Sequence, residues 1–561
     1  MTESASHSLY MNFKNLISSN KKAVGIIIIA VVLTYGQIIL FDFVHLDEDE
    51  LIIGNQSFIG HFKNFFEVFK HDVSFPSGFS AYYRPILTLS FMIDAVTGGL
   101  NPGYYHFTNL VLHAIASVLV FYLFINMGYN SRISLFSSLI FSVHPVLNQA
   151  VAWIPGRNDS LLAVFILLSF LSFIKLMNKP NYLMLAGHII FFTLAVFTKE
   201  TAVALPFIFV AYTFLLKKKS WAFKYVAGSW IASIGIWYFL RQAILQTKDL
   251  AIPDILKMIF GHLPAALAYI GKIMIPYSFS VLPILNNSNL VFGAISILIL
   301  FFMLFRNGIS RRIIFGMAWF ILFLLPSLIS YDDESRVVFF EHRLYIPMMG
   351  FLIILMEIQW AKILSLSEKK TFIAQSLIII ILSLLSIINL QHFKNRLNFW
   401  LSAVDSSPNL ARAHSGLGNT YLAQDELDKA QAEYAKALDI NPKEKKVHNN
   451  LGVMYSTKKL WPMAEAEFKK EIEINNLYEA VYYNLGHLYA VNNKFKDAES
   501  YWLKSLELNP GYIQAHQDLA VYYFQIGDYK KSVYHIEEML KRGAAIHPEL
   551  KKFYERYKAS T

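Results

Sequence analysis

Long apolar runs, interrupted by short polar segments, fill the chain up to about Leu390, whereas apolar and charged positions alternate after Lys394. Because a bilayer core about 30 Å thick is crossed by about 20 residues of helix, the apolar runs predict membrane-spanning helices. We expect about eleven spans, some of them short: 23–40, 106–125, 135–153, 161–176, 183–197, 201–216, 221–240, 290–305, 313–328, 344–360 and 371–390.

The basic residues predict the orientation of these spans, because short cytoplasmic loops are enriched in Lys and Arg. Basic residues precede the first span, and later clusters fall on the same side of the membrane: Arg132, 175–179, 217–219, 306–312 and 362–370. The N-terminus is therefore predicted in the cytoplasm, and an odd number of spans places the C-terminal part on the opposite side. That side is the periplasm if the membrane is a bacterial inner membrane, as we expect, or the lumen of the endoplasmic reticulum in a eukaryote.

The segment 257–285 is apolar, but it contains Lys272 and three prolines. We expect it to be interfacial or re-entrant. If it instead crosses the membrane once, the C-terminal part lies in the cytoplasm.

The C-terminal part repeats every 34 residues. Four columns hold matching residues: Leu417, Leu451, Leu485 and Leu519; Gly418, Gly452 and Gly486; Tyr421, Tyr455, Tyr489 and Tyr523; Ala430, Ala464 and Ala498. This is the tetratricopeptide (TPR) pattern, in which small residues let two antiparallel helices approach closely. We predict a membrane domain over 1–392 and a TPR domain over 393–561, with a half repeat at 394–410, repeats at 411–444, 445–478 and 479–512, and a degenerate cap at 513–561.

Asn450, Asn484 and Asp518 share one register on the first helix of each predicted repeat. Such a ladder could hydrogen-bond the backbone of an extended protein segment, or it could be a solvated polar face. We therefore predict it as an acceptor-binding or partner-binding surface, with the polar face as the alternative.

Composition supports an all-α membrane protein with a TPR solenoid. Hydrophobic residues make up 55% of the 561 residues and charged residues 16%, and the formal net charge is +10. The apolar excess excludes a disordered chain and fits partition into a lipid bilayer. Cysteine is absent, which excludes disulfides, thiolate metal sites and a cysteine nucleophile. We expect no nucleic-acid partner.

Polar segments gather at the predicted outer ends of the spans. They contain an acidic run, 47–50, and several basic or imidazole side chains. In chain order these segments hold Asp47, Glu48, Asp49, Arg84, His144, Arg157, Lys199, Glu200, 332–336, His342 and Arg343. Lys199 is expected to be neutralised by its neighbour Glu200. Several cations facing one anionic segment at a membrane surface predict recognition of a phosphate, which Arg grips through two hydrogen bonds.

Five stretches of the sequence resemble those of a known family. The stretches FVHLDEDELIIGN, YYRPIL, SVHPVLNQAVAWIPGRNDSLLA, FTKET and EHRLYIPMMGF precede the repeats. Together they resemble the transmembrane and TPR-containing (TMTC-like) O-mannosyltransferases and their bacterial relatives, within the C-type superfamily of membrane glycosyltransferases. That family usually has Asp-Asp where this chain has Asp47-Glu48, so which acid acts stays open. The resemblance implies a helical membrane domain, an outward-facing site and a polyprenyl-phosphate sugar as donor.

Transfer from a lipid-phosphate sugar needs a base for the incoming hydroxyl and cations for the departing phosphate. We predict Asp47 as the base, with Glu48 as second choice, and inversion at the anomeric carbon. Arg343, assisted by other side chains, would neutralise the phosphate; the helpers are His342, Arg157 and Arg84, with Lys199 and Glu200 orienting them. His144 could donate a hydrogen bond to the phosphate or be a structural histidine. Asp47 and Asp49 have a spacing that could hold Mg²⁺ or Mn²⁺, or they could face different ways, so the cofactor stays unknown.

The sequence favours an enzyme that moves a sugar, hexosyl or mannosyl, to Ser or Thr hydroxyls of a protein on the outer face, with the repeats recruiting that protein. One alternative is a glycosyltransferase acting on a glycan or lipid, and another is a membrane TPR scaffold without chemistry. A scaffold has no need for four carboxylates beside a cationic rim. A transporter would place its ionisable residues within the spans, whereas most of these lie at span ends.

Overall fold

The computed structural model describes residues 20–75, 82–216, 223–245, 251–277, 279–285, 287–329, 339–542, 544 and 546–560. The predicted basic cluster at 217–219 and the acidic segment at 332–336 lie outside these residues. The elements of the described part are helices, which confirms the all-α prediction.

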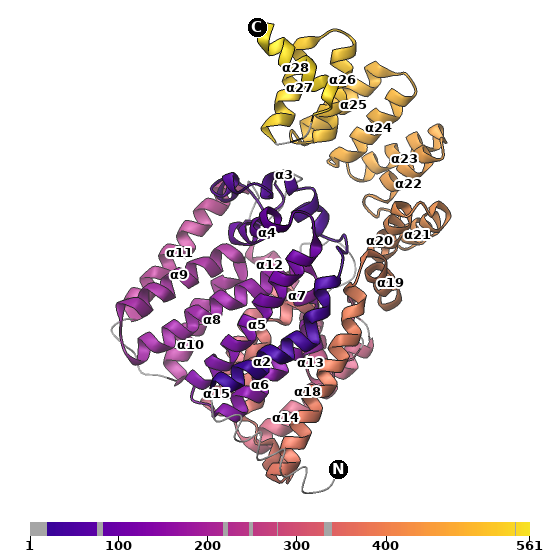
Figure 1. The fold of residues 1–561 in the computed structure, drawn as a ribbon. Coiled ribbons are helices and arrows are strands. Elements are labelled where there is room, and N and C mark those ends of the chain that lie inside the picture. Colours follow the sequence, from indigo (N-terminus) through magenta and orange to yellow (C-terminus); the bar gives the residue numbers. More distant parts are fainter. Residues whose placement is uncertain are drawn as a thin grey trace. The chain divides into compact units, whose positions relative to one another are not determined.

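The chain forms two compact units (Figure 1). Unit 1 consists of Met1–Glu48, Phe66–Val73 and Ala81–Ser406. Unit 2 consists of Asp49–Phe65, Ser74–Ser80 and Ser407–Thr561. The acidic run 47–50 is thus divided between the two units.

Unit 1, which we also call the membrane unit, contains long helices that follow the apolar runs. Its helices are α2 (Asn20–Tyr35), α4 (Pro85–Gly98), α5 (Pro102–Asn126), α6 (Ser131–Val143), α7 (Asn148–Ala152), α8 (Arg157–Asn178), α9 (Tyr182–Thr198), α10 (Leu205–Leu216), α11 (Phe223–Ile244), α12 (Ile252–Gly261), α13 (Leu263–Met274), α14 (Asn287–Asn307), α15 (Arg311–Leu324), α16 (Pro347–Glu357), α17 (Trp360–Ile363), α18 (Glu368–Leu390) and α19 (Arg396–Ser406). Short 3-10 turns join several of them, including η7 (Glu200–Ala204), η8 (Leu325–Leu328) and η9 (Glu341–Leu344). Polar caps begin several of the helices; the Asn101 side chain, for example, accepts the Gly103 N–H at 3.0 Å before α5.

Six helical segments in the described residues are long and apolar enough to cross a membrane. They are Asn20–Leu40, Pro102–Asn126, Ile154–Asn178, Asn289–Asn307, Arg311–Leu328 and Glu368–Phe393. A bent pair, Ser131–Val143 and Pro145–Ala152, could form a seventh span, and five apolar helices are shorter. Membrane-spanning helices are therefore confirmed, whereas the count of about eleven stays a prediction.

The bend in that pair has a local cause. The two helices meet at 51° at His144 and Pro145. Pro145 has no backbone N–H to continue the ladder, and the Nδ1 atom of His144 accepts the Val146 N–H at 3.2 Å as a cap. The sequence predicted a span over 135–153, and the structure has two helices in this stretch with the His-Pro turn between them.

α8 is the most buried of the candidate spans, with 78% of its most apolar window inside the structure. It contacts α5, α9, α10 and α4, so it is packed between several other helices of unit 1. Its first turn is nevertheless polar, with Arg157, Asn158 and Asp159 all buried. Because buried charges need partners, this turn is where interactions between distant segments are expected.

Unit 2 contains the repeats. Its helices are the short α3 (Gln56–Ile59) and then α20 (Ala411–Ala423), α21 (Leu427–Ile440), α22 (Val447–Thr457), α23 (Trp461–Ile474), α24 (Glu479–Val491), α25 (Phe495–Leu508), α26 (Ile513–Gln525), α27 (Tyr529–Lys541) and α28 (Pro548–Ser560). A Cβ atom on Gly452 would lie 2.5 Å from the Phe468 ring, and one on Gly486 would lie 2.7 Å from the Trp502 ring. The glycine column therefore lets the paired helices meet around large aromatic side chains, as the repeat pattern predicts.

Candidate functional site

The first turn of α8 carries the central carboxylate of a charged cluster in unit 1. Lys199 lies directly after α9, and its Nζ atom donates to Asp159 Oδ1 at 2.7 Å and to Asn158 Oδ1 at 3.2 Å. The Lys199 and Asp159 side chains are only 10% and 6% exposed. An ammonium in this setting requires the carboxylate, because an unpaired buried charge is costly.

Glu200 has a different partner from Lys199. Arg84, the residue before α4, donates from Nε to Glu200 Oε2 at 3.0 Å and from Nη2 to Oε1 at 2.5 Å. Lys199 has an extended backbone, with φ of −159° and ψ of 137°, and successive side chains in extended backbone point to opposite sides. The expected pairing of Lys199 with Glu200 is therefore replaced by two pairs, Lys199–Asp159 and Arg84–Glu200.

His342 and Arg343 approach the same carboxylate from η9. His342 Nε2 lies 4.0 Å from Asp159 Oδ2. Arg343 donates from Nη1 to the Ser327 carbonyl at 2.8 Å, and both Arg343 and Arg84 act electrostatically on the Asp159 charge. We name the group of Arg84, Asp159, Lys199, Glu200, His342 and Arg343 the Asp159 cluster. It brings together six residues from four separate stretches of the sequence, and five of them were predicted site residues.

The Asp159 cluster has an excess of positive charge. Three cations surround two carboxylates, and His342 adds no charge at neutral pH. Burial, together with three nearby cations, lowers the pKa of the His342 imidazole well below its usual value. A phosphate group is complementary to such a site, since arginines offer it paired N–H donors and the lysine a point charge.

The turn that carries His342 is anchored by a second buried pair. Lys272 of α13 forms an ion pair with Glu341, and each side chain is 2% exposed. The Ser280 N–H also points to Glu341 Oε1, at 3.4 Å. Lys272, which distinguishes the segment 257–285 from an ordinary span, thus holds η9 in place.

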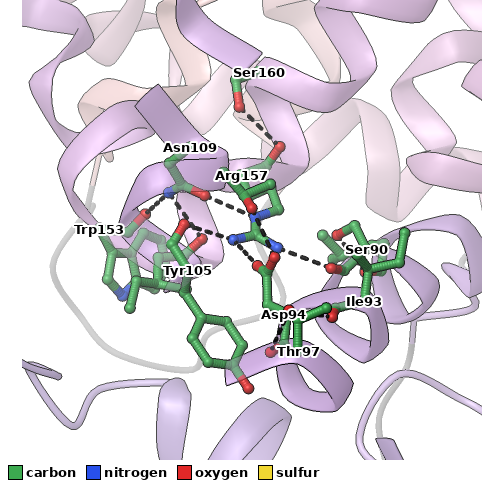
Figure 2. A network of polar contacts seen from close by, with 12 residues as sticks. Ser90, Ile93, Asp94, Thr97, Tyr105, Asn109, Trp153, Arg157 and Ser160 are labelled. Atoms are coloured by element: carbon green, nitrogen blue, oxygen red, sulfur yellow. Dashed lines mark hydrogen bonds and ion pairs between the residues drawn. The ribbon is translucent and has the colours of Figure 1, made fainter. Parts of the chain in front are cut away.

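Arg157 lies in another network, shown in Figure 2. Its side chain is completely buried, and its Nη2 atom lies 2.6 Å from Asp94 Oδ2. The guanidinium also donates to Asn109 Oδ1 at 2.7 Å, to the Tyr105 carbonyl at 2.7 Å and to the Ser90 carbonyl at 3.1 Å. These bonds connect α4, α5 and α8. They leave little donor capacity for a phosphate, although the role predicted for Arg157 stays a prediction.

His144 uses both of its ring nitrogens inside the protein. Nδ1 accepts the Val146 N–H, and Nε2 lies 3.1 Å from the Ile273 carbonyl, to which it donates. This arrangement fits the structural alternative for His144 better than contact with a donor phosphate, and that role too stays a prediction.

The two predicted bases are near the end of the first segment of unit 1. Glu48 is buried, and its Oε2 accepts the Leu46 N–H at 3.0 Å. Asp47 is half-buried, whereas Asp49 is exposed and belongs to unit 2. Among the described residues, no group of three or more His, Asp or Glu side chains is arranged to hold a metal ion. The cofactor therefore stays unknown.

The predicted ladder of unit 2 is partly bonded to itself. Asn450 Nδ2 donates to Asn419 Oδ1 at 2.6 Å, and Asn484 Nδ2 donates to Asn449 Oδ1 at 2.8 Å. Asn449 Nδ2 in turn donates to Asn450 Oδ1 at 3.1 Å. Asp518 continues the register on α26 and is half-buried. These amides connect successive repeats, and their role in binding an acceptor stays a prediction.

Sequence reasoning missed four residues that matter for these networks. Asp94 lies in α4, a helix of 14 residues that was not among the predicted spans, and its pairing with Arg157 could not be seen without the fold. Asp159 and Gln149, whose amide oxygen lies 3.1 Å from His342 Nδ1, are in the His-Pro to Gly-Arg stretch, but they were not assigned a role. Glu341, next to His342, was not recognised as the partner of Lys272.

Sequence reasoning also missed a column of histidines in the repeats, although these histidines recur in the sequence at multiples of 34 residues. In three repeats a histidine on the first helix contacts the second helix of the same repeat: His414–Glu433 at 2.6 Å, His448–Glu467 at 2.5 Å and His516–His535 at 2.8 Å. The first two pairs join an imidazole to a carboxylate, and the last joins two imidazoles. Their responses to acid should therefore differ.

Comparison with known families supports both parts of the chain. Residues 105–240 match the family described as dolichyl-phosphate-mannose-protein mannosyltransferase. Residues 411–444 and 480–512 match tetratricopeptide repeats. The first match covers α5 to α11, including Asp159, Lys199 and Glu200.

Curated relatives point the same way. The chain is 36% identical over 98 residues to mouse protein O-mannosyl-transferase TMTC1 (17% of this chain, 10% of the relative). It is 39% identical over 113 residues to human TMTC4 (18% and 15%) and 38% identical over 107 residues to human TMTC2 (19% and 13%). The resemblance to this group is confirmed, and the matches span 10–15% of the relatives' own length.

Several solved structures are similar to part of this chain. A crystal structure of MamA has 20% sequence identity and a TM-score of 0.24, covering 30% of this chain and 90% of that one. PilF of Pseudomonas aeruginosa has 23% identity and a TM-score of 0.26, covering 29% and 77%.

Proposed function

Because the chain resembles the TMTC O-mannosyltransferases, we propose that it transfers a mannosyl group from a polyprenyl-phosphate carrier to Ser or Thr hydroxyls of a protein. The mannosyltransferase match over 105–240 and the printed activity of the relatives support the reaction class. The proposal places the membrane unit among the C-type glycosyltransferases. It assigns the repeats the task of recruiting the acceptor protein.

The observation that carries this proposal is the geometry of the Asp159 cluster: Lys199 pairs with Asp159, Arg84 pairs with Glu200, and His342, next to Arg343, lies 4.0 Å from Asp159 Oδ2. A departing polyprenyl phosphate gains negative charge as the glycosidic bond breaks. Preorganised cations in a water-poor site stabilise that developing charge without needing to reorganise. Asp159 and Glu200 would hold the cations in place before the donor arrives.

Asp47 is the proposed base, which removes the proton from the acceptor hydroxyl as the oxygen attacks the anomeric carbon. It is half-buried, whereas Glu48 is buried. That difference supports Asp47 over Glu48. Attack opposite to the leaving phosphate gives inversion in a single displacement.

We assign Arg157 and His144 to positioning in this scheme. Arg157 holds the start of α8, and with it Asp159, through its bonds to α4 and α5. His144 caps the turn after the bend and contacts the Ile273 carbonyl. Both residues would then affect the reaction through the geometry of the Asp159 cluster.

The same scheme places the reaction on the outer side of the membrane. The N-terminus would be cytoplasmic, and the repeats would lie in the periplasm of a bacterium, with Asn450, Asn484 and Asp518 on the acceptor-binding surface. A divalent ion remains an open part of the proposal, and it is tested by comparing transfer in EDTA with transfer in Mg²⁺ or Mn²⁺.

The test uses the purified full-length protein, a radiolabelled polyprenyl-phosphate mannose and periplasmic extract as acceptor. We expect wild-type transfer to fall about 10²–10⁴-fold in Asp47→Asn, since a general base contributes that much. A fall of about 10²–10³-fold is expected in Arg343→Ala, because one charge-stabilising donor is lost. Arg312→Ala removes the same kind of side chain from the start of α15, where Arg312 pairs with Glu357, and should transfer normally.

Two results would contradict the proposal. Absence of transfer by the wild type with every donor would favour the scaffold. Equal transfer by wild type, Asp47→Asn and Arg343→Ala would keep an enzyme but reject these residues.

A further inference from the structure

Gln149 fixes the orientation of the His342 ring. Its amide nitrogen donates to the Val281 carbonyl at 2.9 Å, so the amide oxygen must face the other way. That oxygen lies 3.1 Å from the His342 backbone nitrogen and 3.1 Å from His342 Nδ1. Since both of these groups must donate to an amide oxygen, His342 Nδ1 carries a proton.

The other ring nitrogen, Nε2, is therefore an acceptor in the neutral imidazole. The buried setting and the neighbouring cations keep the ring neutral by lowering the pKa of His342. Nε2 lies 4.0 Å from Asp159 Oδ2. The two atoms are too far apart for a hydrogen bond, and both present lone pairs.

Asp159 has its two oxygens in different settings. Oδ1 accepts from Lys199, whereas Oδ2 is buried and has no hydrogen-bond partner among the described residues. His342 and Asp159 are 7% and 4% exposed. A buried carboxylate oxygen without a donor is unfavourable, and His342 Nε2 lies beside it as a second acceptor. A ligand with hydroxyl groups would satisfy both atoms.

We propose that His342 Nε2 and Asp159 Oδ2 bind two neighbouring hydroxyl groups of the donor sugar. Each hydroxyl has one proton to give, so two acceptors require two hydroxyls, and a vicinal diol presents them side by side. This inference rests on the proposed function and names the sugar-binding part of that site. His342 and Asp159 are then specificity-determining residues, and Gln149 is a positioning residue that sets the tautomer.

The location favours the donor sugar over the acceptor hydroxyl. Lys199, one of the proposed phosphate-binding cations, is bonded to the other oxygen of the same Asp159 carboxylate. The sugar is attached directly to the phosphate in the donor, so its hydroxyls lie within reach of groups beside the phosphate. Trp153 contacts the same imidazole, with ring centroids 5.4 Å apart, and its buried Nε1 has no acceptor among the described residues. The indole could therefore add a donor to a sugar oxygen.

The test measures binding of short-chain polyprenyl-phosphate mannose to the full-length protein without an acceptor protein. It is repeated with analogues in which each sugar hydroxyl in turn is replaced by fluorine, which cannot donate a proton. We expect two adjacent positions to weaken wild-type binding by about 10- to 100-fold each, as expected for lost hydrogen bonds to charged or buried acceptors. The remaining positions should change it little.

Matched variants assign the two penalties to the two acceptors. His342→Gln places an amide near the position of Nε2, so replacing the hydroxyl that His342 binds by fluorine should still weaken binding. His342→Asn places an amide only near the position of Nδ1, so the same replacement should no longer weaken binding. Asp159→Asn should reduce the penalty at the adjacent hydroxyl. A merely structural role would weaken all donors equally and leave the pattern of penalties unchanged.

The possible failures are distinguishable. If the parent donor binds and is transferred but all analogues bind equally well, the diol site is rejected and the proposed function stands. A second outcome is that all donor analogues bind equally well but His342→Asn weakens the binding of acceptor peptides. His342 and Asp159 then serve the acceptor, and the inference is again wrong. If the parent donor does not bind the wild type at all, both are rejected.

Discussion

The Arg157 guanidinium is fully buried beside Asp94, and its remaining donors point to carbonyl and amide oxygens of α4 and α5 (Figure 2). On folding, the Arg157 guanidinium and the Asp94 carboxylate each lose their contacts with water and gain a contact with the other. Removing only one of them leaves an uncompensated charge in a low-dielectric environment, which is more costly than removing both. The residue-level account therefore treats Arg157 as a structural anchor, and this can be tested separately from catalysis.

We predict that Arg157→Met destabilises the protein by about 3–5 kcal/mol, because the Asp94 carboxylate loses its buried partner. The double variant Arg157→Met with Asp94→Leu should be clearly more stable than the single one. Thermal unfolding of the purified proteins in one detergent measures both. If Arg157→Met melts like the wild type but no longer binds the donor, Arg157 instead contacts the phosphate as the sequence suggested.

The residues of the site could be predicted by type but not by partner. The basic and acidic side chains at the span ends identified Arg84, Lys199 and Arg343 as a group. Their pairing depended on the extended backbone at Lys199, which sends Lys199 and Glu200 to different partners. Such a choice depends on backbone direction and cannot be read from adjacency in the sequence.

At the scale of helices, periodicity was the most reliable signal. The 34-residue spacing predicted helix pairs whose glycines face aromatic rings, and the contact of Gly452 with Phe468 shows why the column is glycine. Membrane helices were predicted less completely. α4 has 14 residues and was not among the predicted spans, and the span predicted at 135–153 has a bend at His144 and Pro145 that the length of the apolar run does not show.

The last helix pair of the repeats is predicted to be acid-sensitive. His516 Nε2 donates to the Pro510 carbonyl at 3.0 Å, so its Nδ1 accepts from His535 Nδ1 in the neutral pair. Burial, followed by the nearby His516, lowers the pKa of His535 to about 4. The unfolded chain therefore binds more protons than the folded one between about pH 6.5 and 4, and stability falls as the pH is lowered through this range.

This prediction is tested by amide hydrogen exchange of the full-length protein at pH 7 and pH 5, corrected for intrinsic exchange rates. We expect α26 and α27 to lose protection by on the order of 2 kcal/mol at pH 5. The first repeat supplies an internal control. Although burial opposes it, hydrogen bonds from Lys436 and His414 lower the pKa of Glu433, so the pair stays favourable and α20 and α21 should keep their protection. Equal loss in both repeats would contradict the account, as would a pH response that persists in His516→Gln with His535→Gln.

At the scale of the whole molecule, the amphipathic repeats and the apolar runs were separable from the sequence alone. The division of the acidic run between two compact units was not, because it depends on contacts between segments far apart in the chain. The distribution of Lys and Arg predicts which loops are cytoplasmic, and it places the repeats on the outer side only if the number of spans is odd.

The absence of cysteine makes that orientation directly measurable. We predict that single cysteines in Lys179→Cys and Lys362→Cys react with a membrane-impermeant maleimide only after the membrane is permeabilised. A single cysteine in Lys496→Cys, on the repeats, should react in intact cells whose outer membrane has been opened. All three positions are exposed. Labelling of Lys496→Cys only after permeabilisation would place the repeats in the cytoplasm and add one span at 257–285.

The most direct test of the central claim is the configuration of the product. Purified wild-type protein is given polyprenyl-phosphate mannose of one defined anomeric configuration and a Ser- and Thr-containing acceptor, and the new linkage is determined by nuclear magnetic resonance. The account predicts mannose on a Ser or Thr oxygen with the opposite anomeric configuration. A product with the donor's configuration, or no mannosylated acceptor at all, would contradict it.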